Sequence, residues 1–101
     1  MPELDKEGYL VNPRDWTEDL AQEFARQEKV ELTPEHWTVI RFMRAYQDEH
    51  QISPDARFAM RELTERHGAS RNRLFELFPY GYVQQACKIA GMKRPRIWST
   101  G

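Results

Sequence analysis

The sequence contains one cysteine, Cys87, and three histidines among its 101 residues. A single cysteine excludes an internal disulfide, and we expect a protein of the reducing cytoplasm. None of the CxxC, HxxxH or HExxH spacings that hold a metal ion occurs, so no metal site is predicted. The five glycines are scattered, and none forms a glycine-rich loop before a helix. We therefore predict no nucleotide site and no cofactor.

Long apolar runs are also absent. No stretch approaches the roughly 20 apolar residues of a membrane-spanning helix, so we expect no contact with a membrane. The first ten residues, MPELDKEGYL, have neither the basic flank nor the apolar stretch of a signal peptide. Twelve per cent of the residues are aromatic, which is enough for one small core and argues against disorder. A single domain over residues 1–101 is predicted, and a carrier, a binding module or a subunit fits this length better than an enzyme with its own substrate pocket.

Charge is distributed unevenly along the chain. Residues 1–50 carry 6 Lys or Arg and 12 Asp or Glu, whereas residues 51–101 carry 9 and 4. The second half is therefore basic and suited to an anionic partner, unless the two halves neutralise each other within the fold.

Helix start and stop signals recur along the sequence and predict a mainly α protein, a small orthogonal bundle of about five helices. Asp15 with Glu18 resembles a capping box, and the sequences Thr33-Pro34-Glu35 and Ser53-Pro54-Asp55 each combine a cap, a proline and an acid. The expected helices cover about 15–28, 34–49, the segment from Ser53 to Gly68, a short segment after Ser70, and about 81–90. We expect a short β-hairpin over residues 1–12, the bundle over 13–91 and an extended C-terminal arm over 92–101.

Apolar positions suggest which helix faces are buried. In the first helix, Trp16 shares a face with Leu20, Ala21 and Phe24. The helix over 34–49 is apolar on more than one side, which predicts a central position in the bundle. In the last helix, Val83, Ala86, Cys87 and Ala90 follow helical spacing, and Gly91 suits the position after its C-terminus.

Residues 56–78 have the layout of a helix-turn-helix, which is one candidate site for nucleic acid. The candidate DNA-binding residues are Arg71, Asn72 and Arg73 at the start of the second helix, with Arg57, Arg61 and Arg66 placed to reach phosphates. The second helix is short and heavily apolar, however, whereas a recognition helix needs a wide polar face. Two ordinary helices joined by a capped turn give the same pattern.

Cys87 and the basic residues after it form the other candidate site. The position of Cys87 on the inward stripe predicts a buried, inert thiol, whereas the adjacent Lys88 would favour a reactive thiolate. The candidate partner-binding residues are Lys88 and, in the C-terminal arm, Lys93, Arg94, Arg96 and Trp98, a combination of cations and an indole that suits an acidic protein partner. The alternative for the arm is a solvated tail.

Five stretches, in order and covering nearly the whole chain, resemble the DsrC/TusE family, known also as the gamma subunit of dissimilatory sulfite reductase. They are DKEGYL at 5–10, LTPEHW at 32–37, ISP at 52–54, LFPYG at 77–81 and QACKIAG at 85–91. The resemblance implies a small helical bundle with a helix-turn-helix-like element and a short N-terminal hairpin. It also implies sulfur handling with protein partners from a sulfur-relay or sulfite-reductase system.

One departure from the family pattern shapes the expected function. Family members that carry sulfur hold it on a cysteine in the C-terminal arm, and Trp98 stands at that place here. Cys87 matches a second family cysteine, on the last helix. We therefore predict a partner-binding or regulatory member of the family, at most a sulfurtransferase or sulfur carrier in activity. The alternatives are a persulfide carrier that uses Cys87 alone, for tRNA 2-thiolation or sulfite reduction, and a helix-turn-helix DNA-binding regulator.

Overall fold

The computed structural model describes residues 2–93 and consists of five helical segments preceded by an irregular N-terminal segment. The predicted α-helical bundle is confirmed. Its elements are the 3-10 turn η1 (Pro13–Asp15), α1 (Glu18–Gln27), α2 (Pro34–His50), α3 (Ala56–Arg61) continued by the π-helical η2 (Glu62–Arg66), α4 (Arg73–Leu77), and the π-helical η3 (Tyr82–Cys87). No helix in the described part of the chain is long and apolar enough to cross a membrane.

The N-terminal segment reverses direction as predicted but forms no strand within residues 2–12. A single antiparallel bridge joins Leu4 and Leu10. The Asp5 carboxylate accepts hydrogen bonds from the backbone N–H groups of Glu7 and Tyr9, each at 2.9 Å, and these bonds hold the turn. An isolated two-stranded ribbon is marginal in water. Packing of the buried Tyr9 and Leu10 on the helical bundle stabilises this turn instead.

Helix α1 begins at Glu18, and the prediction that Asp15 caps it is wrong. Asp15 lies in η1, whereas the Thr17 hydroxyl accepts a hydrogen bond from the Leu20 N–H at 3.1 Å. The cap at Thr17 leaves Trp16 outside the helix, so Trp16 does not share the buried face of Leu20 and its neighbours. The side chain of Trp16 turns instead toward the end of the last helix.

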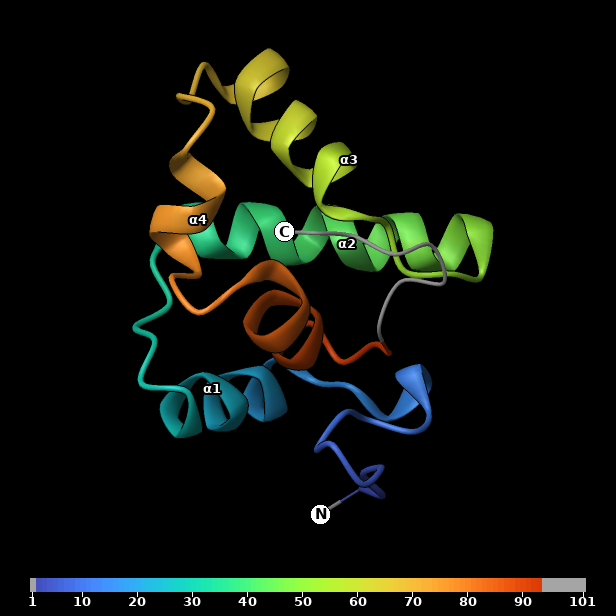
Figure 1. Ribbon diagram of the computed structural model, residues 1–101. Helices are drawn as coiled ribbons and strands as arrows, with labels where there is room; N and C mark the ends of the chain where they lie inside the picture. The colour runs from blue at the N-terminus through green and yellow to red at the C-terminus, as the bar shows by residue number, and fades with distance from the viewer. Residues whose placement is uncertain (1, 94–101) are drawn as a thin grey trace.

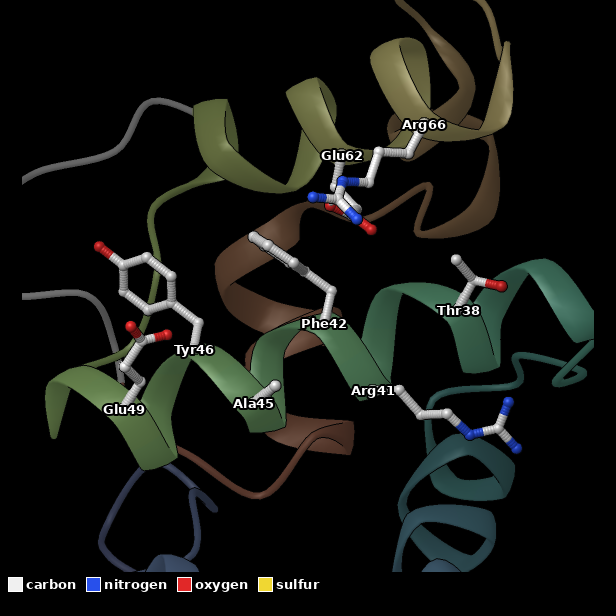
Figure 2. Close-up of a pocket in the computed structure, with 8 residues that line it drawn as sticks. All are labelled: Thr38, Arg41, Phe42, Ala45, Tyr46, Glu49, Glu62 and Arg66. Atoms are coloured by element: carbon white, nitrogen blue, oxygen red, sulfur yellow. The ribbon is translucent and has the colours of Figure 1, made fainter.

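Helix α2 starts at Pro34 after Thr33, as the sequence predicts. It crosses the middle of the molecule, with α3 on one side and α1 with the last helix on the other, and α4 lies at its N-terminal end (Figure 1). One face is buried, and contains His36, Val39, Ile40 and Met43. The second apolar stripe is only half-buried and lines an open cleft of about 510 Å³ against η2, drawn in Figure 2.

Helix α3 starts two residues later than the Ser53-Pro54 signal suggests. The cap is Asp55, whose carboxylate accepts a hydrogen bond from the Arg57 N–H at 2.8 Å, so Pro54 precedes the helix. The α3–η2 helix and α4 reproduce the predicted helix-turn-helix-like layout. In α4, Phe75 is 39% exposed. Its side chain lies outside the core that the sequence pattern suggested.

The last helix lies in the interior, between α1 and α2 (Figure 1). Its buried side chains come from Tyr82, Gln85, Ala86, Cys87, Ile89 and Ala90. The predicted stripe is therefore too narrow, because the adjoining face of Tyr82, Gln85 and Ile89 is buried as well. The start of this helix is held by Tyr82, whose hydroxyl donates to the Pro54 carbonyl at 2.7 Å, and by Tyr9, whose hydroxyl donates to the Val83 carbonyl at 3.0 Å.

Candidate functional site

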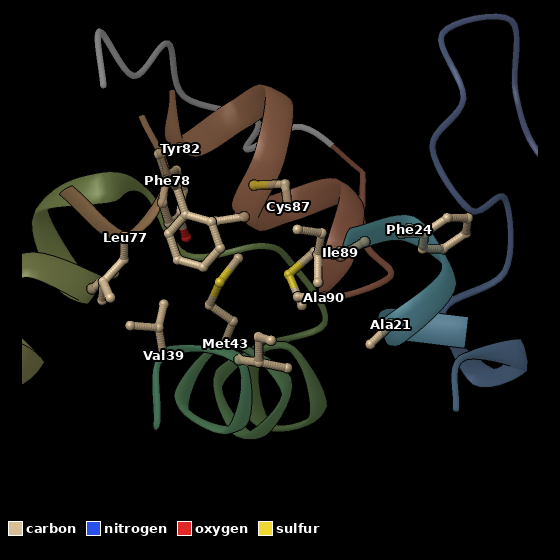
Figure 3. Packing of buried hydrophobic residues seen from close by; sticks show 14 of the residues in the cluster. Ala21, Phe24, Val39, Met43, Leu77, Phe78, Tyr82, Cys87, Ile89 and Ala90 are labelled. Atoms are coloured by element: carbon tan, nitrogen blue, oxygen red, sulfur yellow. The ribbon is translucent and has the colours of Figure 1, made fainter. Parts of the chain in front are cut away.

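Cys87 lies at the end of η3 and is fully buried, with 0% of its surface exposed. Figure 3 shows it among the core side chains, with Tyr82 beside it and Met43 below. Its neighbours Ala86, Ile89 and Ala90 on the same helix are also fully buried. The thiol therefore has no open path to a reagent in this conformation.

Burial also changes the acidity of this thiol. It raises the pKa of Cys87 from 9.0 to about 12, and a hydrogen bond with the Tyr82 side chain opposes the rise without reversing it. Desolvation penalises the charged form of any thiol, and among residues 2–93 no cation approaches closely enough to compensate. Since the thiolate is the nucleophile in sulfur chemistry, the geometry favours the inert interpretation of Cys87.

Lys88 follows Cys87 but points away from it. Its ammonium lies 3.7 Å from a Glu28 carboxylate oxygen and 5.3 Å from the centre of the Tyr9 ring. Only 21% of the Lys88 side chain is exposed. The interactions of Lys88 link the last helix to the end of α1 and to the N-terminal turn, and they direct its charge away from the thiol.

The start of the C-terminal arm is fixed at successive residues. Gly91 has φ +75°, the left-handed conformation expected of the residue that ends a helix. The Met92 N–H donates to the Cys87 carbonyl at 3.0 Å, and the Met92 side chain is fully buried. Lys93 is exposed, and its carbonyl accepts a hydrogen bond from the Ser53 hydroxyl at 2.7 Å. The other arm residues singled out from the sequence, Arg94, Arg96 and Trp98, lie outside the described residues.

The arginines of the helix-turn-helix-like element are largely engaged within the protein. Arg57 pairs with Asp55 at 2.8 Å, and Arg66 lies 3.6 Å from a Glu62 oxygen. The Arg61 guanidinium lies 6.0 Å from the centre of the Phe58 ring.

At the start of α4, Arg73 binds the Glu35 carboxylate of α2 and also pairs with Glu76 at 3.2 Å. Arg71 and Asn72 are exposed in the turn before α4. Because α4 has only five residues and Arg73 is held by α2, this element lacks the wide polar face of a recognition helix.

Several contacts of the last helix could not be found from the sequence. Arg44 carried no signal, because a lone arginine on an amphipathic helix is usually solvated. The apolar spacing places Trp16 on the buried face of α1, which is wrong. Both side chains reach the carbonyl end of the last helix, and no local pattern encodes that meeting.

Within residues 2–93, no group of three or more His, Cys, Asp or Glu side chains is arranged to hold a metal ion.

Comparison with known proteins decides the family. The family model described as "DsrC like protein" matches residues 1–97. The chain belongs to the DsrC-like family. This result confirms the resemblance seen in the five sequence stretches, and the relatives named below show that the family is one of sulfur-relay proteins.

Two curated relatives of this DsrC-like chain are named sulfurtransferase TusE. The protein from Buchnera aphidicola subsp. Schizaphis graminum is 42% identical over 96 residues, which cover 92% of this chain and 84% of the relative. The protein from Yersinia pseudotuberculosis is 41% identical over 96 residues, with 92% and 89% covered.

Solved structures of the family share the fold. The oxidized gamma-subunit of dissimilatory sulfite reductase (DsrC) from Archaeoglobus fulgidus superimposes with a TM-score of 0.84 at 30% identity, covering 96% of this chain and 91% of that one. Allochromatium vinosum DsrC gives a TM-score of 0.82 at 40% identity, with 94% and 88% covered. The DsrC-like fold thus extends over nearly the whole of this chain.

Proposed function

We propose that this DsrC-like chain is a sulfur-relay protein that acts by binding its protein partners, and that Cys87 does not carry sulfur in the folded protein. The burial of the Cys87 thiol carries the proposal, together with the rise of its pKa to about 12. Sulfur transfer requires a thiolate that can meet the sulfane sulfur of another protein. A protonated thiol enclosed by a packed helix meets neither requirement.

The partner contacts are assigned to the C-terminal arm. Its residues Lys93, Arg94, Arg96 and Trp98 combine cations with an indole, and the exposed Lys93 marks where the arm leaves the body. Arginine and tryptophan are the residue types that most often anchor protein interfaces. An indole cannot hold sulfane sulfur, so Trp98 suits binding and not transfer. Lys88 is paired with Glu28, and this pair holds the last helix against the end of α1.

These residues define the kind of partner. Three cations without an acid between residues 92 and 101 favour an acidic surface, and the indole favours an apolar pocket within it. The relatives are sulfurtransferases by name or subunits of dissimilatory sulfite reductase. A component of a sulfur-relay or sulfite-reductase system is therefore the proposed partner, with a regulatory consequence when the chain occupies a site meant for a sulfur carrier.

A sulfur-loading experiment tests the first part of the proposal. The protein is incubated with inorganic polysulfide, and its intact mass is measured in buffer and in denaturant. We expect no added sulfur on the native protein and addition at Cys87 in denaturant, where the thiol is exposed. A gain on the native protein that prior alkylation blocks would contradict the proposal and favour a persulfide carrier acting through Cys87.

A binding experiment tests the second part. Binding to a dissimilatory sulfite reductase and to a TusE-accepting sulfurtransferase complex is measured for the wild type, Trp98→Ala and Cys87→Ser. We expect Trp98→Ala to weaken the complex at least tenfold, which is the loss of about 1.4 kcal/mol, and Cys87→Ser to leave it intact.

Lys6→Ala is the matched control for binding, because Lys6 is an exposed cation far from the arm in sequence. Equal binding by wild type and Trp98→Ala would contradict the assignment of the arm. A salt-dependent DNA gel shift abolished by combining Arg71→Ala with Arg73→Ala would favour the nucleic-acid function instead.

A further inference from the structure

The last helix ends in three consecutive backbone carbonyls that accept hydrogen bonds from side chains of other segments. The Trp16 indole N–H donates to the Ile89 carbonyl at 2.9 Å. The Arg44 Nη1 donates to the carbonyls of Ala90 at 3.1 Å and Gly91 at 3.4 Å. Carbonyls at a helix C-terminus lack partners within the helix. Two side chains, one from the N-terminal segment and one from α2, supply these partners.

Trp16 and Arg44 also hold each other in place. The Arg44 guanidinium carbon lies 4.6 Å from the centre of the Trp16 ring. The second guanidinium nitrogen, Nη2, donates to the Pro13 carbonyl at 2.9 Å, so the cation bridges η1 and the last helix. Its positive charge faces the negative end of the helix dipole. Replacement of Arg44 would therefore loosen both sides of this contact.

Gly91 shows how tightly the indole covers this end. A Cβ atom at Gly91 would lie 2.2 Å from Trp16 Cδ1 and 2.7 Å from Trp16 Cγ, closer than any side chain tolerates. The residues that follow are held as well, Met92 by burial and Lys93 by its bond from Ser53. The chain is thus fixed at each residue from 89 to 93, immediately before the arm.

We propose that Trp16 and Arg44 form a clamp that fixes the backbone of residues 89–93, and that both are positioning residues for the contacts proposed for the arm. The inference rests on the proposed partner-binding function for its biological consequence. The hold of the clamp on residues 89–93 is independent of any partner. Fixing the start of the arm reduces the conformational entropy that the arm loses when it binds.

Spin labelling of an introduced cysteine tests the clamp directly. Lys93→Cys places an exposed thiol at the start of the arm, while the buried Cys87 leaves the parent protein unlabelled. The nitroxide mobility is then compared with and without Arg44→Met, which keeps a long apolar stem and removes the donors. We expect the rotational correlation time to fall several-fold in Arg44→Met, as a restrained segment gains the fast motion of a free terminus.

Control variants separate positioning from stability. Trp16→Phe keeps a ring for the guanidinium and removes only the indole N–H, and it should increase the label mobility by a smaller factor. Arg41→Met makes the same chemical change on an exposed residue of α2 and should not alter the mobility. Leu20→Ala should lower the melting temperature without moving the label. Unchanged mobility in a folded Arg44→Met protein would overturn the clamp, and Trp16→Phe decides the question if Arg44→Met does not fold.

Binding then tests the positioning role. With sulfite reductase as the probe, Arg44→Met should weaken the complex several-fold while Arg41→Met should not. Greater label mobility with unchanged affinity would overturn the positioning role. Failure of the wild type to form the complex would instead count against the proposed function, because the label mobility reports the clamp without any partner.

Discussion

His36 connects the start of α2 to the end of α4, and this contact predicts a loss of stability in mild acid. Its Nδ1 accepts a hydrogen bond from the Thr33 N–H at 3.1 Å and lies 2.8 Å from the Thr33 hydroxyl oxygen. Its Nε2 lies 2.7 Å from the Leu77 carbonyl oxygen. A carbonyl can only accept, so Nε2 carries the proton and the buried imidazole is neutral. Protonation would turn Nδ1 into a donor facing the Thr33 N–H.

The sign of the pH dependence follows from this geometry. Burial lowers the pKa of His36 below its ordinary value of 6.5, the bond to Leu77 opposes the change, and Arg73 adds to it while Glu35 opposes it. The unfolded chain therefore takes up the proton at higher pH than the folded protein. The stability contribution is present above pH 6.5 and is lost as the pH falls. Phe78 packs edge-on against the imidazole at 5.1 Å and provides no charge to compensate.

The size of the effect is bounded from two sides. A single group can change the free energy of unfolding by about 1.36 kcal/mol per pH unit, which allows at most about 2 kcal/mol between pH 6.5 and 5. The loss of one helix-capping hydrogen bond corresponds to about 1 kcal/mol. We expect the free energy of unfolding to fall by about 1–2 kcal/mol over this range because of His36.

Urea unfolding followed by circular dichroism at pH 5, 6, 7 and 8 measures this effect. His36→Gln is the informative variant, because a glutamine at this position completes the capping box with Thr33 but does not titrate. Its stability should vary less with pH than that of the wild type. The double variant His50→Gln with His67→Gln removes the two exposed histidines and should keep the wild-type pH dependence. A constant stability difference between wild type and His36→Gln from pH 5 to 8 would refute the argument.

Three further predictions concern the buried last helix and the residue that ends it. At pH 7.5, iodoacetamide should alkylate Cys87 at least about a thousandfold more slowly in the native protein than in the unfolded protein. A pKa of about 12 in place of 9.0 lowers the thiolate fraction by that factor. Comparable rates would show an accessible thiol. Gly91→Ala should lower the free energy of unfolding by at least about 1 kcal/mol, since φ is +75° and Trp16 occupies the space; an unchanged melting temperature would contradict this. Tyr82→Phe should destabilise by about 1–3 kcal/mol, because the Pro54 carbonyl loses its donor, and urea unfolding measures it.

Local signals located the helices well where one cap stands alone. Thr33-Pro34 is such a case, since the proline suits only the first helical position and the predicted start is correct. Where two capping residues lie two positions apart, the sequence was misleading. Asp15 and Thr17 both suit a cap, and so do Ser53 and Asp55, and in each pair the structure uses the second.

Contacts distant in sequence explain at least one of these choices. A cap at Thr17 leaves the Trp16 ring outside the helix, where it reaches the Ile89 carbonyl, 73 residues away, and the Arg44 guanidinium. Hydrophobic periodicity likewise found the burial of Cys87 but not the direction of Lys88, which depends on Glu28 at the end of another helix. Local patterns therefore predicted the elements, whereas the setting of the candidate site came from pairings between them.

Exposure of Cys87 would require more than a side-chain rotation, and this argues for a binding role. Ala86 and Ile89 in the last helix and Met92 just after it are each fully buried, and the Met92 N–H is bonded to the Cys87 carbonyl. Exposing a buried Ile or Met side chain costs about 1.5–3 kcal/mol each. Displacing the helix far enough to free the thiol would thus use much of the roughly 5–15 kcal/mol that stabilises a domain. Binding through residues after the helix end, as proposed above, requires no such loss.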